Sequence, residues 1–87
     1  MAETGGRRDL PPLRKIHSDE FIEAQKRPSL AAFRKMSTAD LVASLAPGQP
    51  EPLTVKRDGR VLQGNTRIKV LEERGYDVDS LPRVILD

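Results

Sequence analysis

The chain has 87 residues, a length that suits one small domain burying only about 60% of the surface that its unfolded form exposes. It has no cysteine and one histidine, His17, which excludes disulfides and a cysteine nucleophile and argues against a metal site. No segment suits a membrane span or a signal peptide, so we expect a cytoplasmic protein without a membrane partner. The net charge of +2 is too small to indicate a nucleic-acid partner by itself.

The composition divides the chain into two parts. Residues 1–9 combine glycine with charged and polar residues, which predicts a flexible tail that folding does not need. Residues 10–87 are expected to form a single domain. Short apolar runs alternate there with helical patterns, which predicts an α/β (α+β) domain with a small mixed sheet and two or three helices.

The first half of the domain carries a short strand and helical patterns. Residues 13–16 suit an edge strand that leads into a short acidic helical turn capped by Ser18. A second helix is expected over residues 28–36, entered at a proline. A third begins at Ser37, with Asp40 in a capping-box-like position, and stops at residues 46–48. Its apolar stripe consists of Leu41, Val42 and Leu45.

A hairpin follows the third helix. Residues 53–57 and 60–63 are two short runs joined by Asp58 and Gly59. An Asp-Gly pair between such runs predicts an antiparallel hairpin, because both turn positions tolerate positive φ.

A strand-to-helix junction and a last strand complete the domain. After Gly64, residues 65–74 read as a helix with Asn65 or Thr66 as N-cap and Gly75 at its end. Residues 81–86 predict a strand that returns to the sheet. One core is expected to contain Leu41, Leu45, Val61, Ile68, Leu71, Val84 and either Leu86 or Ile85. Val70 is expected to face partly inward, and Leu81 of the last strand is expected to be buried.

The segment "QGNTR" is the candidate binding site. A strand that runs through Gly64 into a helix presents unpaired backbone N–H groups at the helix start, and these can bind an anion. Gly64 would let a ligand approach the backbone, and Arg67 in the first turn has a planar guanidinium suited to phosphate. The alternative is purely structural: Gly64 allows a bend, Asn65 caps the helix and Arg67 is a solvated side chain.

The order of elements around "DGRVLQGNTR" and "ERGYDVDSLPRVI" resembles the ParB-like nuclease or ParB/sulfiredoxin superfamily. The resemblance extends over residues 13–86. It implies a ParB/sulfiredoxin-like fold in which a G-x-x-R motif binds the phosphates of a nucleoside triphosphate, with Mg²⁺ as a candidate cofactor, or of DNA. The site would comprise Gly64, Asn65, Thr66 and Arg67, approached by an upstream basic stretch at Lys26, Arg27, Pro28 and Ser29.

The chain also departs from the superfamily pattern. Asn65 stands where sulfiredoxins carry a reactive cysteine, which excludes sulfinic-acid reduction by that route. ParB proteins that bind cytidine triphosphate resemble G-E-R-R here, and Asn65 and Thr66 replace the middle pair, which weakens the case for nucleotide hydrolysis. The helix-turn-helix and dimerisation segments of partitioning proteins have no counterpart in these residues, so we expect a stand-alone core.

Each of the other charged residues allows a functional and a structural interpretation. Lys56, Arg57 and Arg60 are candidate contacts to nucleic acid or phosphate, although single basic pairs usually form a solvated face. Asp58 could hold magnesium, but the adjacent glycine explains it as a turn residue. His17 could be a general base, yet no orienting carboxylate is recognisable. Glu72 and Glu73 read as solvated, pairing at best with Lys69.

The sequence therefore predicts a domain that binds a phosphate-bearing ligand, DNA or a nucleoside triphosphate, at the G-x-x-R motif. Two alternatives remain open. One is a metal-dependent nuclease or nucleotide hydrolase, and the other is a non-catalytic protein-interaction module of a plasmid, phage or toxin–antitoxin system. If the motif binds phosphate, Arg67→Ala should weaken binding and leave the fold intact.

Overall fold

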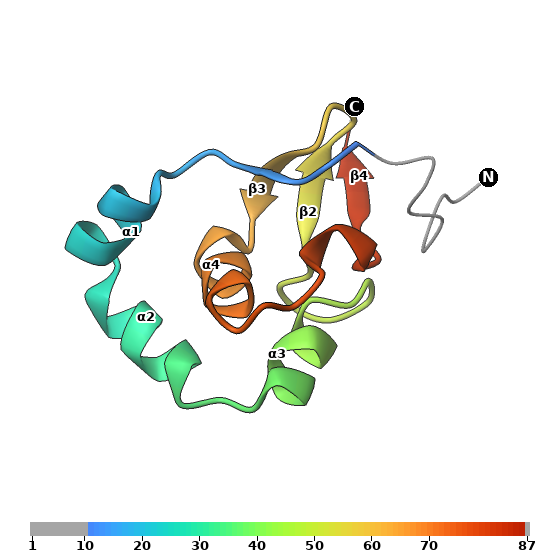
Figure 1. Cartoon of the computed structure of the whole chain (residues 1–87). Helices are drawn as coiled ribbons and strands as arrows, with labels where there is room; N and C mark the ends of the chain where they lie inside the picture. The colour runs from blue at the N-terminus through green and yellow to red at the C-terminus, as the bar shows by residue number, and fades with distance from the viewer. Residues whose placement is uncertain (1–10, 87) are drawn as a thin grey trace.

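The computed structural model describes residues 11–86, and the expected tail over residues 1–9 lies outside them. The described chain forms a mixed α/β domain, as the sequence predicts (Figure 1). Its strands are β1 (Arg14–Lys15), β2 (Thr54–Lys56), β3 (Arg60–Gln63) and β4 (Val84–Leu86). Its helices are α1 (Asp19–Gln25), α2 (Arg27–Arg34), α3 (Thr38–Ser44), α4 (Asn65–Glu73) and the short 3-10 helix η2 (Val78–Ser80). None of these helices combines the length and apolar character that crossing a membrane requires.

Four α-helices are described where the sequence predicts two or three. The expected acidic turn is a complete helix, α1, whose N-cap Ser18 side chain accepts a hydrogen bond from the Phe21 N–H at 3.0 Å. Lys26 ends α1 and begins α2, which carries a proline in its first turn. Ser37 caps α3 in the same manner, accepting from the Asp40 N–H. The capping serines thus mark two helix starts as predicted.

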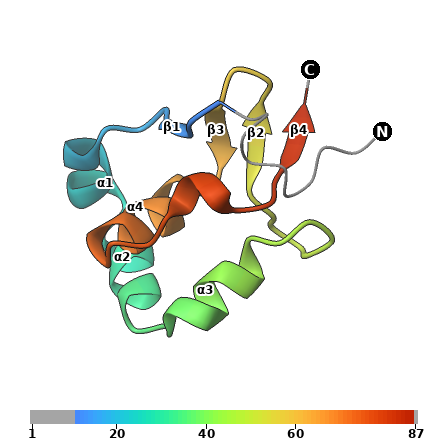
Figure 2. The same cartoon turned by 45° about the vertical axis from the view of Figure 1, so that its right-hand side comes forward.

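Helices α1, α2 and α3 form an arc around α4, which occupies the middle of the domain (Figure 1). Figure 2 shows the sheet at one end of this arrangement, with α3 beneath it. Because α4 has neighbours on several sides, even some of its polar residues are buried. The buried residues of α4 are Asn65, Arg67, Ile68, Lys69, Val70 and Leu71.

The sheet has the strand order β1-β3-β2-β4. The hairpin β2–β3 is antiparallel as predicted, while β1 and β4 are parallel to their neighbours. The hairpin turn differs in detail from the expectation, because Gly59 is the only residue of the turn with positive φ. Its N–H donates to the Lys56 carbonyl at 2.9 Å. The loop is therefore a turn completed by a left-handed glycine.

The core gathers most of the predicted apolar residues. Its buried members are Ile22, Leu30, Leu41, Leu45, Leu53, Val55, Val61, Ile68, Val70, Leu71, Val78 and Leu81. In β4 the prediction left Leu86 or Ile85 open: Ile85 packs against the core, and Leu86 is 46% exposed. Val84 is only half-buried, because alternation along the strand turns it to the same side as Leu86.

Candidate functional site

Helix α4 is preceded by Gly64, which adopts a left-handed conformation with φ 110°. Its carbonyl accepts the first hydrogen bond of the helix, from the Ile68 N–H at 2.8 Å. Gly64 is therefore the N-cap, and the expectation of Asn65 or Thr66 in this role was wrong. The N–H groups that follow have no partner within the helix, since the first turn has no preceding carbonyls. They form the positive end of the α4 dipole.

The glycine at position 64 is required by the core. A Cβ built there would lie 3.1 Å from the Leu45 Cδ2 and 3.5 Å from the Leu53 Cδ1. Packing and the positive φ thus both explain the glycine. The idea that it leaves room for a ligand is not needed, because the missing side chain faces the apolar core.

The Asn65 side chain joins three segments. Its Oδ1 accepts from the Ile16 N–H at 2.9 Å, and its Nδ2 donates to the Val61 carbonyl at 2.8 Å. Asn65 is 6% exposed, so these bonds satisfy both ends of a buried amide. Its role is to attach the segment after β1 to β3 and α4, and its side chain is not available to a ligand.

The Arg67 side chain is also buried, with 6% exposure. One guanidinium nitrogen donates to the carbonyl and hydroxyl of Ser44, each at 3.1 Å, and another donates to the Glu51 carbonyl at 2.7 Å. The guanidinium carbon lies 5.9 Å from the centre of the Phe33 ring. Burial lowers the pKa of Arg67, with the Glu51 charge opposing. The alternative of a solvated Arg67 was therefore wrong, and these contacts predict that Arg67→Ala also destabilises the fold.

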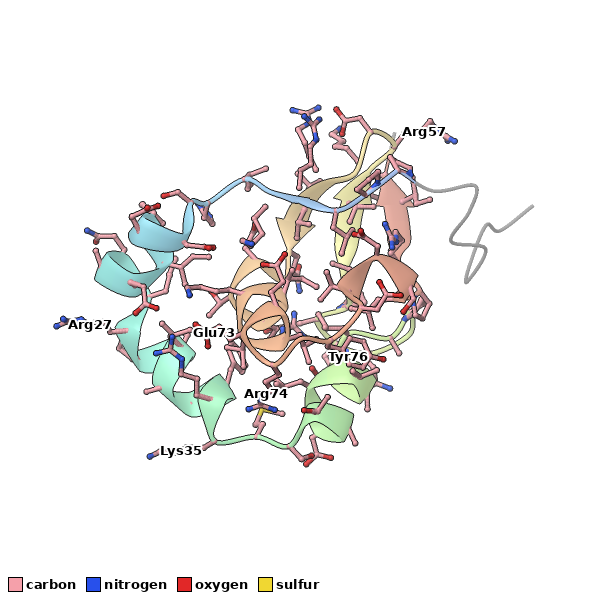
Figure 3. The ribbon with its side chains drawn as sticks, in the orientation of Figure 1. Arg27, Lys35, Arg57, Glu73, Arg74 and Tyr76 are labelled. Atoms are coloured by element: carbon pink, nitrogen blue, oxygen red, sulfur yellow. The ribbon has the colours of Figure 1, made fainter. Side chains whose placement is uncertain are left out.

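A hollow of about 260 Å³ lies at the start of α4. It is lined by His17, Lys26, Ser29, Phe33, Glu51, Leu62, Gln63, Gly64, Asn65, Thr66 and Arg67. We call it the α4 hollow. The structure thus brings Lys26 to the G-x-x-R segment, as the resemblance implies, and adds a histidine and a carboxylate. Arg27 does not line the hollow, and its side chain points away from the domain in Figure 3.

The other candidate cations lie elsewhere. Lys56, Arg57 and Arg60 line a separate hollow of about 270 Å³ at the hairpin turn, together with Asp58 and Leu86. Strand β3 connects the two places, with Arg60 at its start and Gln63 at its end beside Gly64. Arg57 projects from the hairpin end in Figure 3. The sequence candidates therefore form two groups and not one.

Asp58 belongs to the hairpin turn, as its neighbouring glycine indicates. Its carboxylate accepts from the Arg60 N–H at 3.1 Å, and the Arg60 and Arg14 side chains pair with it at 3.0 and 3.3 Å. These contacts, led by the backbone bond, lower the pKa of Asp58. Asp58 does not approach the α4 hollow, so a magnesium ion held there by Asp58 is excluded.

Glu72 and Glu73 form more ion pairs than the sequence predicts. Glu72 pairs with Lys15 of β1. Glu73 lies between α2 and α4 (Figure 3), paired with Arg34 and Lys69. Hydrogen bonds from Arg34 and then Lys69 lower the pKa of Glu73 to about 2. These pairs join α4 to its surroundings.

Phe33, Glu51 and His17 line the α4 hollow, although none of them is among the phosphate-binding residues that the sequence predicts. Phe33 falls within the helix expected over residues 28–36, and Glu51 follows the third helix in a stretch without a distinguishing pattern. For His17 the sequence shows no orienting carboxylate. In the structure its ring stacks on the Phe21 ring, with ring centres 4.7 Å apart. The sequence signal for His17 is its position directly before Ser18, the N-cap of α1.

Comparisons of the chain with protein-family models, curated proteins and solved structures find no match. Within residues 11–86, no three His, Cys, Asp or Glu side chains are grouped as metal ligands would be.

Proposed function

We propose that this domain binds the phosphate of a nucleoside triphosphate or of DNA in the α4 hollow. The supporting observation is the meeting of three features in one place. The N-terminus of α4 opens into the hollow, the Thr66 hydroxyl lies in its first turn, and the Lys26 ammonium comes from the α1–α2 junction. The N–H groups of a helix start, a hydroxyl and a cation together favour an anionic ligand.

The role of each group follows from how it is held. The N–H groups of the first turn and the Thr66 hydroxyl can donate to phosphate oxygens. Lys26 is exposed and can turn toward a ligand. Arg67 supplies positive charge from beneath the hollow, but its guanidinium already bonds Ser44 and Glu51. It therefore acts through its charge and not as a two-pronged phosphate ligand.

The resemblance of "QGNTR" to the G-x-x-R motif of the ParB/sulfiredoxin superfamily adds support for this proposal. Gly64 and Arg67 would correspond to the two constant positions of the motif. Asn65, held by Ile16 and Val61, has a structural role here in place of the sulfiredoxin cysteine or the ParB glutamate.

A thermal-shift panel tests the proposal. Nucleoside triphosphates, inorganic triphosphate and duplex DNA are each added with and without Mg²⁺. A ligand at a hundredfold its Kd should stabilise the fold by about 2.7 kcal/mol. Thr66→Val, which removes the hydroxyl but keeps the shape, and Lys26→Ala should each reduce affinity about threefold to tenfold.

Lys35→Ala is the matched control, because Lys35 is exposed at the end of α2 (Figure 3) and does not line the hollow. It should bind as the parent does. Parental binding by both Thr66→Val and Lys26→Ala would place the ligand elsewhere. A panel without any shift would reject phosphate binding and favour the protein-interaction alternative.

The enzymatic alternative is associated with Glu51, the carboxylate that lines the α4 hollow. A nuclease or nucleotide hydrolase needs an acid near the phosphate, to hold a metal or to activate water. Magnesium-dependent turnover that Glu51→Gln abolishes, with ligand binding preserved, would support this alternative. Binding without turnover would leave a binding domain.

A further inference from the structure

The outer face of the sheet carries a row of residues across all four strands. Val55 and Val61 pair with each other and are buried, with exposures of 1% and 0%, so they define the inner face. Because side chains alternate along a strand, Lys56 and Arg60 point to the outer face. Arg14 is in register with Arg60.

Leu86 completes this row, since it is in register with Lys56. In strand order the row reads Arg14, Arg60, Lys56 and Leu86, and we call it the outer row. Neighbouring strands lie about 4.8 Å apart, so three cations stand side by side on three adjacent strands. Arg57 lies next to them in the turn and lines the same hollow.

Positive charge exceeds negative charge at this end of the sheet. Asp58 is shared by Arg14 and Arg60, so one carboxylate faces two guanidinium groups. Within residues 11–86, the basic residues at this end are Arg14, Lys56, Arg57 and Arg60, and the acidic residue among them is Asp58.

Two cations in other parts of the described chain have two carboxylate partners each. Lys15 lies between Asp19 and Glu72, and Lys69 lies between Glu23 and Glu73. Arg14 and Arg60 are instead exposed, with 61% and 51% of their side chains accessible. The outer row therefore retains a positive surface that solvent can reach.

We propose that the outer row, with Arg57, binds the phosphodiester backbone of a nucleic acid without reading its sequence. Three of the four cations are arginines, whose planar guanidinium suits phosphate oxygens. The apolar neighbours do not demand an apolar partner, because Leu62 and Leu86 are 39% and 46% exposed, which is ordinary on protein surfaces. The exposed guanidinium groups of Arg14 and Arg60 share one carboxylate, and the phosphates of a nucleic-acid backbone can add further contacts to them.

This site is independent of the α4 hollow, since the two lie at opposite ends of β3. A small phosphate ligand in the α4 hollow would not occupy the outer row. Loss of either site would leave the other intact, so each proposal can fail alone.

The test measures the affinity of the full chain for an arbitrary duplex of about 24 base pairs over a range of salt concentrations. Arg60→Ala and Arg14→Ala should each lower affinity about threefold to tenfold, and each should flatten the salt dependence by about 0.9 in log–log slope. Lys35→Ala, the matched loss of one exposed cation away from the sheet, should change affinity less than about twofold. The melting temperature of each variant checks that the fold is kept.

The outcomes are distinct. Equal loss in Lys35→Ala and Arg60→Ala would mean a response to net charge alone and would overturn the proposal. Unchanged affinity in both Arg14→Ala and Arg60→Ala would do the same. Poly-L-glutamate is the competing probe. If it binds as tightly as the duplex and depends on the same arginines, the outer row binds an acidic protein and the proposal is overturned.

Discussion

The two ends of strand β3 use their polar residues in opposite ways. At the α4 end, Asn65 and Arg67 are buried, and backbone groups of distant segments hold their side chains. At the hairpin end, Arg14 and Arg60 are exposed around one turn carboxylate. A motif residue that looks functional in the sequence can therefore be structural, while unremarkable surface cations are left available to a partner.

The largest expected effect belongs to the core beneath α4. Leu71 is fully buried, and Leu71→Ala should lower the free energy of unfolding by about 2–5 kcal/mol, because it removes buried methyl groups and leaves a cavity. Chemical denaturation measures this loss. Stability equal to that of the parent would show that α4 does not occupy the centre of the fold.

Arg67→Ala should be the next most damaging change. It leaves the carbonyls of Ser44 and Glu51 without their donor, at an expected cost of about 1.5–3 kcal/mol. Arg67→Lys should recover only part of this, since an ammonium cannot reproduce the planar set of donors. Urea titrations of both variants measure the free energy of unfolding. If Arg67→Ala is as stable as the parent, the two ends of β3 do not differ in the way described.

Acid should weaken the attachment of α2 to α4 through Glu73. The pKa of Glu73 is lowered from 4.5 to about 2 in the folded chain, so the unfolded chain binds more protons between these values. The stability that Glu73 contributes is thus present above pH 4.5 and is lost as the pH falls toward 2. We expect this contribution to the free energy of unfolding to be about 1 kcal/mol, since solvent screens the partly exposed ion pair.

Glu73→Gln is the matched variant for this acid effect. It removes the titrating group and keeps the shape, so its stability should change less than the parent's between pH 4.5 and 2. Unfolding curves at a series of pH values measure the difference. Parallel pH profiles for parent and variant would show that other carboxylates carry the acid sensitivity.

The smallest effects on stability are expected at the hairpin end. Arg60→Ala and Leu86→Ala should each change the free energy of unfolding by less than about 0.5 kcal/mol, because both side chains are largely solvent-accessible. Thermal melts suffice to measure this. A loss as large as that of Arg67→Ala would mean that the outer row, too, is structural.

Local patterns predicted much of this fold. The hairpin around Gly59, the serine caps and the apolar face of α4 depend on neighbours within a few residues, so the sequence contains the relevant physics. The hydrogen-bond partners of Asn65 and Arg67 are instead distant in the sequence. Ile16 is 49 residues from Asn65, and Ser44 is 23 residues from Arg67. Apolar periodicity predicts which side of a helix is buried but not which distant carbonyl a polar side chain will reach.

Strand β4 shows a second limit. Its residues allowed either Leu86 or Ile85 as the inward position, and the two choices differ by one step along the strand. Such a step exchanges the two faces of a strand, and only pairing with a neighbour decides it. Register with Val55 turns Ile85 inward and leaves Leu86 on the outer row.

The side-chain hydrogen bonds of Asn65 and Arg67 at the start of α4 also affect how the domain opens. Asn65 holds the chain at Ile16, before α1, and Arg67 holds it at Ser44 and Glu51, after α3. One helical turn thus secures both ends of the 16–51 arc. Helices α1 to α3 cannot detach from either end without breaking a contact to α4, so we expect their backbone amides to exchange with solvent deuterium as one cooperative unit.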